Sequence, residues 1–400
     1  MNGDSTFINY CNLFGEEIRL NTLVITKGTE LLFFNVFPKE IIQFINSLYV
    51  KCKIEEYGST KISCGNKTSI IGRNGLMYYC GLTNANNPPI LEFQSTGIKD
   101  VDLCTFSNTK SSPDVINDCI MYQQKNKILR YVYGNDNISN SIINLDAIQI
   151  KSGTQNTFII TKENDLFGCG DNGYGQLGLG RYTPYCYSFC RIDISNVISV
   201  ECGLGHTLVL TKEGLFGCGN NHDNQLGLIN RHTYMILTKI DIDNVISFAC
   251  GMYHSLILTK EGLFYCGSKH NQDRRGSKHN QDKPVRVRTY IETEILQGYS
   301  YCFIINNFMK LPIHNIISFS CGYNYSLILT KKGLIEFTTT SGDQYIKRID
   351  YMKNVLSISC GKKYAIVLTK EGLFGRGKNK YGQLGLGDCD TQDKFTKIVF

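Results

Sequence analysis

The chain has 400 residues, 42% of them hydrophobic and 19% charged, with a formal net charge of +7. These shares are ordinary for a globular protein, and 38 glycines against 7 prolines favour many tight turns over disordered linkers. No run approaches the roughly 18 uninterrupted apolar residues of a membrane-spanning helix. The start, MNGDSTFINYCNLFGEE, lacks the basic and apolar parts of a secretion signal. We therefore expect an intracellular protein, cytoplasmic or nuclear and not secreted, that contacts no membrane.

Taken in chain order, eight segments have the pattern of a β-hairpin, in which a tight turn joins two apolar runs. In the most regular copies the turn is Thr-Lys-Glu-Gly, whose glycine can take positive φ. A short helix is expected at Pro38–Tyr49, between the first two hairpins. The eight segments are Thr22–Asn35, Ser63–Gly81, Cys119–Gly134, Ser152–Gly170, Glu201–Gly219, Ala249–Gly267, Ser320–Phe337 and Ser359–Gly377.

The spacing of the hairpins predicts the architecture. Corresponding positions Thr157 and Thr207 are 50 residues apart, and Thr207 and Ser255 are 48 apart. A further apolar run precedes the hairpins, as in Asn196–Cys202 (NVISVEC) and Asn244–Cys250 (NVISFAC). Because one such unit cannot bury its own apolar face, repeats of this length must stack. Four strands per period with glycine punctuation predict an all-β propeller of four-stranded blades.

Two further motifs carry a family resemblance. Gly173–Gly180 reads GYGQLGLG and Lys380–Gly387 reads KYGQLGLG, while Cys202–Leu208 and Cys250–Leu256 share Cys-Gly-x-x-His-(Ser/Thr)-Leu. Together they resemble the repeat of the regulator of chromosome condensation family, clearly over residues 152–268 and 316–400 and thinly over the first 150.

The resemblance implies a seven-bladed propeller whose N- and C-terminal segments share one blade, so that Thr391–Phe400 pairs near the N-terminus. The tally of hairpins leaves eight blades open. We expect one domain over residues 1–400, with degenerate repeats in 1–150 and clear repeats in 151–400.

Several repeated positions are expected to be structural. His206 and His254 occupy a position that elsewhere holds Thr, Asn or Tyr, so we expect this side chain to close a turn by a hydrogen bond rather than to catalyse. Gln176 and Gln383 are expected to bond neighbouring backbone. The anchor glycines of the repeats are Gly65, Gly153, Gly203, Gly251, Gly322 and Gly361.

Motifs of cofactor chemistry are weak. Gly168–Gly173 matches GxGxxG, but no helical period follows to supply a helix N-terminus for a phosphate. Nine of the 17 cysteines directly precede a glycine, which predicts small, buried, reduced side chains. Cys186 and Cys190 lack a second pair, which argues against zinc. We expect no catalytic residue, cofactor or metal, and hence no enzyme.

The segment Gly267–Arg288 departs from the period. It contains two near-identical nine-residue copies and carries a net charge of +5, and it opens a basic insertion that we place at 267–296. It is interpreted either as a solvated loop, since long loops cost little closure entropy, or as a contact for an acidic partner or a phosphate backbone. The candidate contact residues are Arg274, Arg275, Lys278, Lys283, Arg286 and Arg288.

Three functions follow from these observations. The first is a monomeric scaffold whose rim loops bind a protein partner. The second is guanine-nucleotide exchange on a small GTPase, which the resemblance implies for the family and for which no residue here can be named. The third is binding of chromatin or nucleic acid, although the N-terminus is not basic.

Overall fold

The fold is described from a computed structural model. It describes residues 25–27, 30–32, 61–65, 67–73, 76–81, 88–96, 101–112, 115–124, 127–132, 147–153, 155–180, 183–267, 285–291, 294–302, 304–305, 308–339 and 344–399. The chain divides into two compact units, Met1–Glu55 and Glu56–Phe400. In the first unit, β1 (Ile25–Lys27) and β2 (Glu30–Leu32) form an antiparallel pair. The expected helix at 38–49 lies outside the described residues.

The described residues of the second unit form six blades of at least four strands. In blades 1, 2, 3 and 6, four consecutive antiparallel strands form the sheet. Blade 1 consists of β3 (Lys61–Cys64), β4 (Thr68–Arg73), β5 (Leu76–Gly81) and β6 (Ile90–Ser95). Blade 2 consists of β10 (Ala147–Ser152), β11 (Asn156–Thr161), β12 (Leu166–Asp171) and β13 (Tyr185–Ile192). Blade 3 consists of β14 (Val197–Cys202), β15 (His206–Thr211), β16 (Gly214–Gly219) and β17 (Tyr234–Lys239). Blade 6 consists of β29 (Val355–Cys360), β30 (Tyr364–Thr369), β31 (Gly372–Gly377) and β32 (Gln392–Ile398).

Blades 4 and 5 contain the insertion. It leaves blade 4 after its third strand and returns as its fourth, and between them a hairpin joins blade 5, where β21 pairs in parallel with β28. Blade 4 consists of β18 (Val245–Cys250), β19 (His254–Thr259), β20 (Gly262–Gly267), β24 (Phe308–Leu311) and β23 (Ile304–Ile305). Blade 5 consists of β25 (Ile316–Cys321), β26 (Tyr325–Thr330), β27 (Gly333–Thr339) and β28 (Gln344–Ile349), extended by β21 (Val285–Ile291) and β22 (Glu294–Cys302).

The described part of the second unit is all-β, as predicted, but the blade count was wrong. We predicted seven four-stranded blades, with eight open, and the described residues form six. Between blades 1 and 2 the described residues form a three-stranded sheet, β7 (Val101–Ser112), β8 (Val115–Gln124) and β9 (Lys127–Val132). The predicted first hairpin, β1–β2, belongs to the other unit. The irregular N-terminal repeats therefore caused the error in the predicted number of blades.

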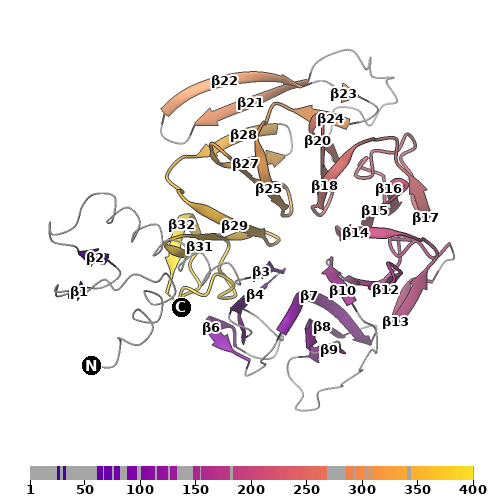
Figure 1. Ribbon diagram of the computed structural model, residues 1–400, viewed down its shortest axis with the longest axis horizontal. Helices are drawn as coiled ribbons and strands as arrows, with labels where there is room; N and C mark the ends of the chain where they lie inside the picture. The colour runs from indigo at the N-terminus through magenta and orange to yellow at the C-terminus, as the bar shows by residue number, and fades with distance from the viewer. Residues whose placement is uncertain are drawn as a thin grey trace, which may run out of the picture. The chain divides into compact units, whose positions relative to one another are not determined.

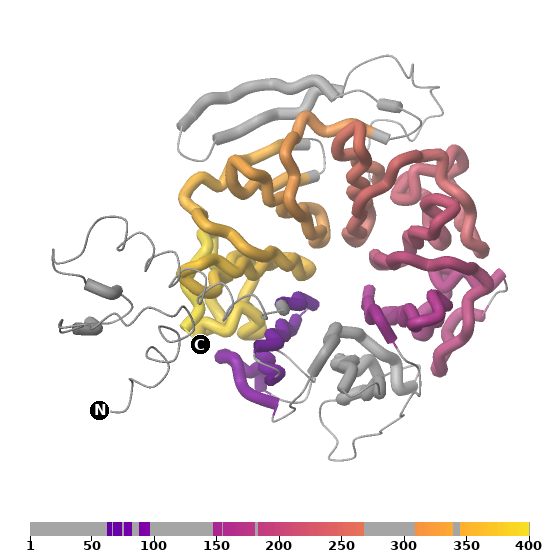
Figure 2. The backbone as a smooth tube through the Cα atoms, in the orientation of Figure 1, coloured from indigo at the N-terminus to yellow at the C-terminus, as the bar shows by residue number. Residues whose placement is uncertain are grey.

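In the residues that the structure describes, the expected closure between the two chain ends is not seen. β32 pairs with β31, so blade 6 is built entirely from its own repeat. Blade 6 instead contacts blade 1 through β29 and β3, and the yellow last blade lies beside the indigo first blade in Figure 2. The first strands of neighbouring blades also contact one another along the series β10, β14, β18, β25 and β29, and β7 contacts both β4 and β10 (Figure 1).

The core lies between consecutive blades. Phe158 of blade 2 packs in one cluster with Val200 and Val209 of blade 3, and Leu256 of blade 4 packs in another with Ile328 and Phe337 of blade 5. Each blade thus buries its apolar side chains only by stacking, as expected for repeats. In the described residues, no helix has the length and hydrophobicity needed to span a membrane.

Candidate functional site

The two ends of the blades differ in chemistry. We use the name turn face for one of these two ends. It comprises the Cys-Gly-x-x turns that join first strands to second strands, together with the loops that follow the third strands. The opposite face carries the Thr-Lys-Glu-Gly turns. There Thr211 Oγ1 accepts the Glu213 N–H at 3.1 Å, and Gly214 takes φ 127°. This turn geometry recurs at Thr259 and Thr369.

Anchor glycines bring the blades together at the turn face. A Cβ on Gly203 would lie 2.3 Å from the Gly251 carbonyl oxygen, and one on Gly251 would lie 2.8 Å from that of Gly322. Distances under 3.0 Å are not tolerated, so these positions require glycine for close approach rather than for a turn alone. The same geometry links Gly153 to Gly203, Gly322 to Gly361 and Gly361 to Gly65.

His206 and His254 join neighbouring blades. His206 Nε2 lies 3.0 Å from Ser255 Oγ of blade 4, and His254 Nε2 lies 2.9 Å from Ser326 Oγ of blade 5. The bond that we expected to close a turn instead crosses to the next blade. Burial lowers the pKa of His206 to about 3 and that of His254 to about 4. Both rings are therefore neutral at neutral pH.

Tyrosines at the same repeat position reach equivalent groups. Tyr364 Oη donates to the Thr68 carbonyl at 2.7 Å and lies 3.0 Å from Ser69 Oγ, which joins blade 6 to blade 1. Tyr325 Oη donates to the backbone carbonyl of Tyr364, because Ala365 replaces the usual Ser or Thr of the next blade. Asn156 is shorter, and its buried amide has no partner in the described structure.

The glutamine loops form a second link between blades. Gln176 Oε1 accepts the Tyr174 N–H at 2.9 Å, and Gln383 Oε1 accepts the Tyr381 N–H at 2.9 Å. The Gln176 carbonyl accepts from Thr207 Oγ1 at 2.7 Å and from Cys218 Sγ at 3.4 Å, both in the next blade. The cysteine before the glycine is therefore a donor as well as a small apolar side chain.

Aromatic rings and ammonium groups gather on the turn face. The rings of Tyr253 and Tyr323 meet edge to face at 5.5 Å, and the ammonium groups of Lys362 and Lys363 lie 5.8 and 5.4 Å from the Tyr323 ring centre. Around blade 1, Lys67 and Lys380 lie 4.9 and 5.9 Å from the ring centre of Tyr381. We call this set the tyrosine–lysine cluster: Lys67, Tyr253, Tyr323, Lys362, Lys363, Lys380 and Tyr381.

The backbone holds this cluster in place. The Met252 N–H donates to the Gly322 carbonyl at 3.2 Å, and the Tyr323 N–H donates to the Lys362 carbonyl at 3.0 Å. The Lys362 N–H in turn donates to the Gly65 carbonyl at 3.2 Å. Adjacent turns are thus bonded across the blade boundaries, which fixes the side chains that they carry. Burial and the nearby Tyr323 raise the pKa of Tyr253, which stays protonated.

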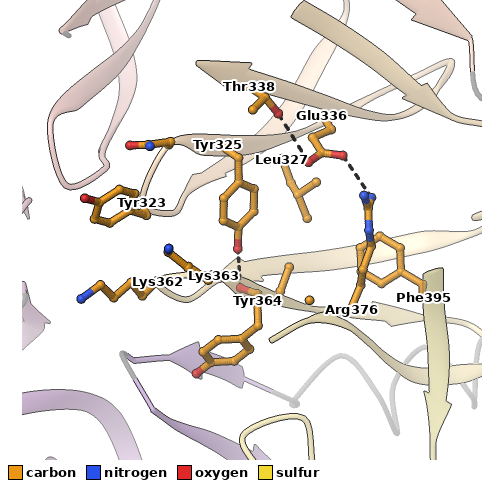
Figure 3. Close-up of a pocket in the computed structure, with 13 residues that line it drawn as sticks. Tyr323, Tyr325, Leu327, Glu336, Thr338, Lys362, Lys363, Tyr364, Arg376 and Phe395 are labelled. Atoms are coloured by element: carbon orange, nitrogen blue, oxygen red, sulfur yellow. Dashed lines mark hydrogen bonds and ion pairs between the residues drawn. The ribbon is translucent and has the colours of Figure 1, made fainter. Parts of the chain in front are cut away.

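A pocket of about 290 Å³ opens between blades 5 and 6 (Figure 3). On the side away from Tyr323, Arg376 Nη1 pairs with Glu336 Oε2 at 3.0 Å, and both side chains are largely buried. Leu327, Ala365 and Phe395 supply apolar wall, and Lys362 and Lys363 lie on the side where Tyr323 stands.

The opposite face carries a repeated apolar position. Each of five first strands has an irregular register at its second residue, and that residue is not paired with the second strand. A bulge of this kind turns the extra side chain out of the sheet. The five residues are Ile148, Ile198, Ile246, Ile317 and Leu356, with exposed fractions of 36% to 60%.

The predicted basic contact residues are not brought together as a loop. Arg286 and Arg288 lie within β21, which is paired on both sides, so the interpretation of this part as a solvated loop was wrong. The alternation of apolar and polar residues in VRVRTYI suits a strand. Arg274, Arg275, Lys278 and Lys283 lie outside the described residues.

No chemistry of a cofactor or metal stands out in the described ranges. They contain no group of three or more His, Cys, Asp or Glu side chains that could hold a metal ion. Cys186 and Cys190 lie in β13, and Gly168–Gly173 runs from β12 into a turn, not into a helix. Sequence reasoning missed the tyrosine–lysine cluster and the pocket. The sequence signal for the pocket was the presence of Glu336, Ala365 and Arg376 at positions where other repeats have different residues.

Repeated four-stranded blades, stacked through glycine contacts, define a β-propeller. Residues 147–176 and 197–225 match one family model of the regulator of chromosome condensation (RCC1) repeat, and residues 163–210 and 213–258 match another. Residues 147–258 therefore carry repeats similar to the RCC1 repeat.

Relatives of known sequence match a short part of the chain. Human probable E3 ubiquitin-protein ligase HERC4 is 35% identical over 78 residues, which are 18% of this chain and 7% of HERC4. The ultraviolet-B receptor UVR8 of Arabidopsis thaliana is 36% identical over 78 residues, which are 19% of this chain and 17% of UVR8. The chain thus matches only a small fraction of the length of these relatives.

Solved structures support the fold. Yeast RCC1 (Prp20), in its complex with Kap60, superposes with a TM-score of 0.59 over 80% of each chain at 15% identity. Human WBSCR16 superposes with a TM-score of 0.50 at 20% identity, covering 85% of this chain and 83% of that protein. These identities establish similarity of fold and no more.

Proposed function

We propose that the chain is a non-enzymatic protein-interaction scaffold, monomeric and intracellular, whose turn face binds an acidic surface of a partner protein. The observation that carries this proposal is the tyrosine–lysine cluster. Tyrosine is enriched at protein interfaces, where it supplies a large contact area with little loss of conformational freedom. Positive charge beside these rings favours a negatively charged partner and speeds its association.

The rest of the turn face agrees with this role. Circumferential backbone bonds hold the turns rigid, so little entropy is lost when a partner docks. The buried histidines and tyrosines are occupied in joining blades and are not free to react. The described cysteines that precede glycine are buried or half-buried, and burial raises the pKa of the Cys64 thiol to about 11 and of the Cys266 thiol to about 12. Such thiols are poor nucleophiles.

Affinity capture with three forms of the full chain tests this proposal. The turn-face variant combines Lys67→Glu, Lys380→Glu and Tyr253→Ser, and the matched control combines Ile198→Ser and Ile246→Ser on the opposite face. Proteins captured from the native host are quantified by mass spectrometry. We expect acidic partners that the wild type and control retain and the turn-face variant loses. Retention by the turn-face variant with loss by the control would refute the assignment of the face.

Exchange on a small GTPase and binding of chromatin or nucleic acid are the alternatives. The structure of yeast Prp20p was described together with its binding to Gsp1p and histones. A strongly basic partner such as a histone would be repelled by the tyrosine–lysine cluster, so this observation favours the acidic partner. If a small GTPase is captured, release of its labelled nucleotide on addition of the chain decides the exchange alternative.

A further inference from the structure

The pocket occupies a place that a loop fills at other blade boundaries. Three blades follow their third strand with Asn-x-x-x-Gln-Leu-Gly, and in each the glutamine carbonyl accepts hydrogen bonds from the next blade. After blade 3, the Gln225 carbonyl accepts from Ser255 Oγ at 2.8 Å and Cys266 Sγ at 3.3 Å. After blade 6, the Gln383 carbonyl accepts from Ser69 Oγ at 2.7 Å and Cys80 Sγ at 3.3 Å.

The leucine of this loop fills the space between the sheets. Leu177 is fully buried in one cluster with Phe158. A Cβ on Gly168 would lie 3.1 Å both from Leu177 Cδ2 and from Phe158 Cε1, so the leucine side chain lies against these two positions of its own blade.

Blade 5 has no such loop, and the residues that would contact it have changed. Its third and fourth strands are joined by residues 340–343 alone. By position in the repeat, Leu327 and Glu336 stand where blade 2 has Phe158 and Gly168. Ala365 and Arg376 of blade 6 stand where blade 3 has a threonine and a cysteine. These four residues all line the pocket, which is therefore the place of the missing loop.

The charges of the pocket select its occupant. Arg376 and Glu336 neutralise each other, and Thr338 Oγ1 also donates to Glu336 Oε1 at 3.4 Å. Lys362 and Lys363 interact with the Tyr323 ring, and in the described residues neither forms an ion pair. An apolar pocket with two uncompensated ammonium groups beside it suits an aliphatic side chain flanked by carboxylates.

We propose that this pocket receives one aliphatic side chain from an acidic segment of the partner protein. That side chain fills the space between blades 5 and 6, as the leucine of the Gln-Leu-Gly loop fills the space between sheets at other blade boundaries. The segment's carboxylates pair with Lys362 and Lys363. This inference rests on the proposed binding of an acidic partner at the turn face. A protein segment fits better than nucleic acid, because Leu327, Ala365 and Phe395 match an aliphatic group and not a phosphate.

Fluorescence polarisation with the full chain tests the pocket. The probe is a labelled peptide with one leucine between two glutamate pairs. In one control peptide alanine replaces the leucine, and in a second glutamine replaces each glutamate. Inorganic phosphate is added as a competitor. We expect the alanine and glutamine peptides to bind at least about tenfold more weakly than the probe, and phosphate to compete poorly. Equal binding of the alanine peptide, or no binding of the probe to the wild type, would overturn the proposal.

Variants separate the pocket from the surrounding charge. Ala365→Leu fills the pocket, and Ala365→Met fills it with a more adaptable chain should leucine disturb folding. Either variant, with an unchanged melting temperature, is expected to weaken the probe at least about tenfold. Lys362→Glu with Lys363→Glu should do the same, and Lys212→Glu with Lys260→Glu on the opposite face should have no effect.

The outcome of the pocket test can be distinguished from the outcome of the capture experiment that tests the proposed function. Undiminished binding to both filled variants would overturn the pocket. The capture experiment uses other residues, Lys67, Tyr253 and Lys380, so it can still succeed when the pocket fails.

Discussion

At the scale of single residues, one side chain per repeat carries the link between blades. His206, His254, Tyr325 and Tyr364 differ in chemistry, yet each places a polar atom against the next blade. A position that tolerates such variation requires a side chain that is long enough to contact the next blade and that ends in a polar atom. It does not require a particular side-chain pKa. The sequence indicated a structural role from this variation. It could not indicate the partner, because the bonded groups lie 36 to 296 residues away.

We expect His206→Ala and His254→Ala each to lower the free energy of unfolding by about 2 to 4 kcal/mol, because each removes a buried ring and one hydrogen bond. Ser255 keeps its bond to the Gln225 carbonyl, which limits the loss in the first variant. Chemical denaturation measures the change. Loss of partner binding at an unchanged midpoint would instead place these histidines in the binding site.

The same histidines predict a dependence of stability on pH. Burial holds both folded-state pKa values below the ordinary value of 6.5, at about 3 and about 4. Between these values and 6.5 the unfolded chain binds more protons, so stability is complete above about pH 6.5 and falls as the pH is lowered. The expected slope is up to about 1.4 kcal/mol per pH unit for each histidine. Denaturation of His254→Tyr from pH 7 to pH 4.5 should show a shallower slope than wild type, and an equal slope would contradict the assignment.

At the scale of elements, the glutamine loops are fixed by a buried asparagine. Asn379 Oδ1 accepts the Leu384 N–H at 2.8 Å, and its Nδ2 donates to the Asp388 carbonyl at 2.9 Å. Asn172 and Asn221 accept equivalent bonds. The motif GQLGLG was visible in the sequence, but the asparagine four residues before the glutamine was not singled out.

Asn379→Ala is expected to destabilise the chain by about 1 to 3 kcal/mol, because it leaves buried backbone groups without partners. Asn220→Ala is the matched control, since Asn220 Oδ1 accepts only an exposed N–H from His222. Thermal unfolding of both variants, followed by circular dichroism, compares the two. Equal melting temperatures would show that the loop is held by its glycines alone.

The insertion shows where element prediction fails. Hairpin spacing placed the excess residues at 267–296, and in the described residues the third strand of blade 4 ends at Gly267 and its fourth begins at Phe308. It could not show that β21 and β22 extend blade 5, because pairing with β28 is a long-range contact between strands of ordinary composition. The pocket was hidden for the same reason: its walls come from two repeats, and each looks regular alone.

Deleting one nine-residue copy, Gly276–Pro284, is expected to change the free energy of unfolding by less than about 0.6 kcal/mol, since loop closure depends weakly on length. Urea denaturation of the shortened chain measures this. A larger loss would mean that the duplicated segment packs against the blades.

At the scale of the whole molecule, rigidity and recognition come from the same turns. The anchor glycines let the blades approach, the backbone bonds between turns fix that approach, and the Tyr and Lys side chains between the glycines and the second strands form the outer surface. All-β architecture and stacking could be predicted from period alone. The blade count could not, because the sheet between blades 1 and 2 has three strands in the described residues and the β1–β2 hairpin lies in a separate unit.

Gly322→Ala tests this coupling. The added Cβ would clash with the Tyr325 ring and lie 2.8 Å from the Gly361 carbonyl oxygen, so the Tyr325 ring or the contact between blades 5 and 6 must shift. We expect a loss of about 2 kcal/mol or more, in the range of overpacked sites, with weaker partner binding. Gly333→Ala is the control for added volume, because its Cβ would meet nothing within 4 Å, although its φ of 131° adds local strain. A Gly322→Ala variant no less stable than this control would argue against tight blade contact.

Hydrogen–deuterium exchange with and without a captured partner tests the central claim most directly. If the turn face is the binding surface, the partner slows exchange at residues 251–254, 322–325 and 361–364 and leaves the Thr-Lys-Glu-Gly turns at 211–214, 259–262 and 369–372 unchanged. Slower exchange confined to those turns and to the bulges at Ile198 and Ile246 would contradict the account and place recognition on the opposite face.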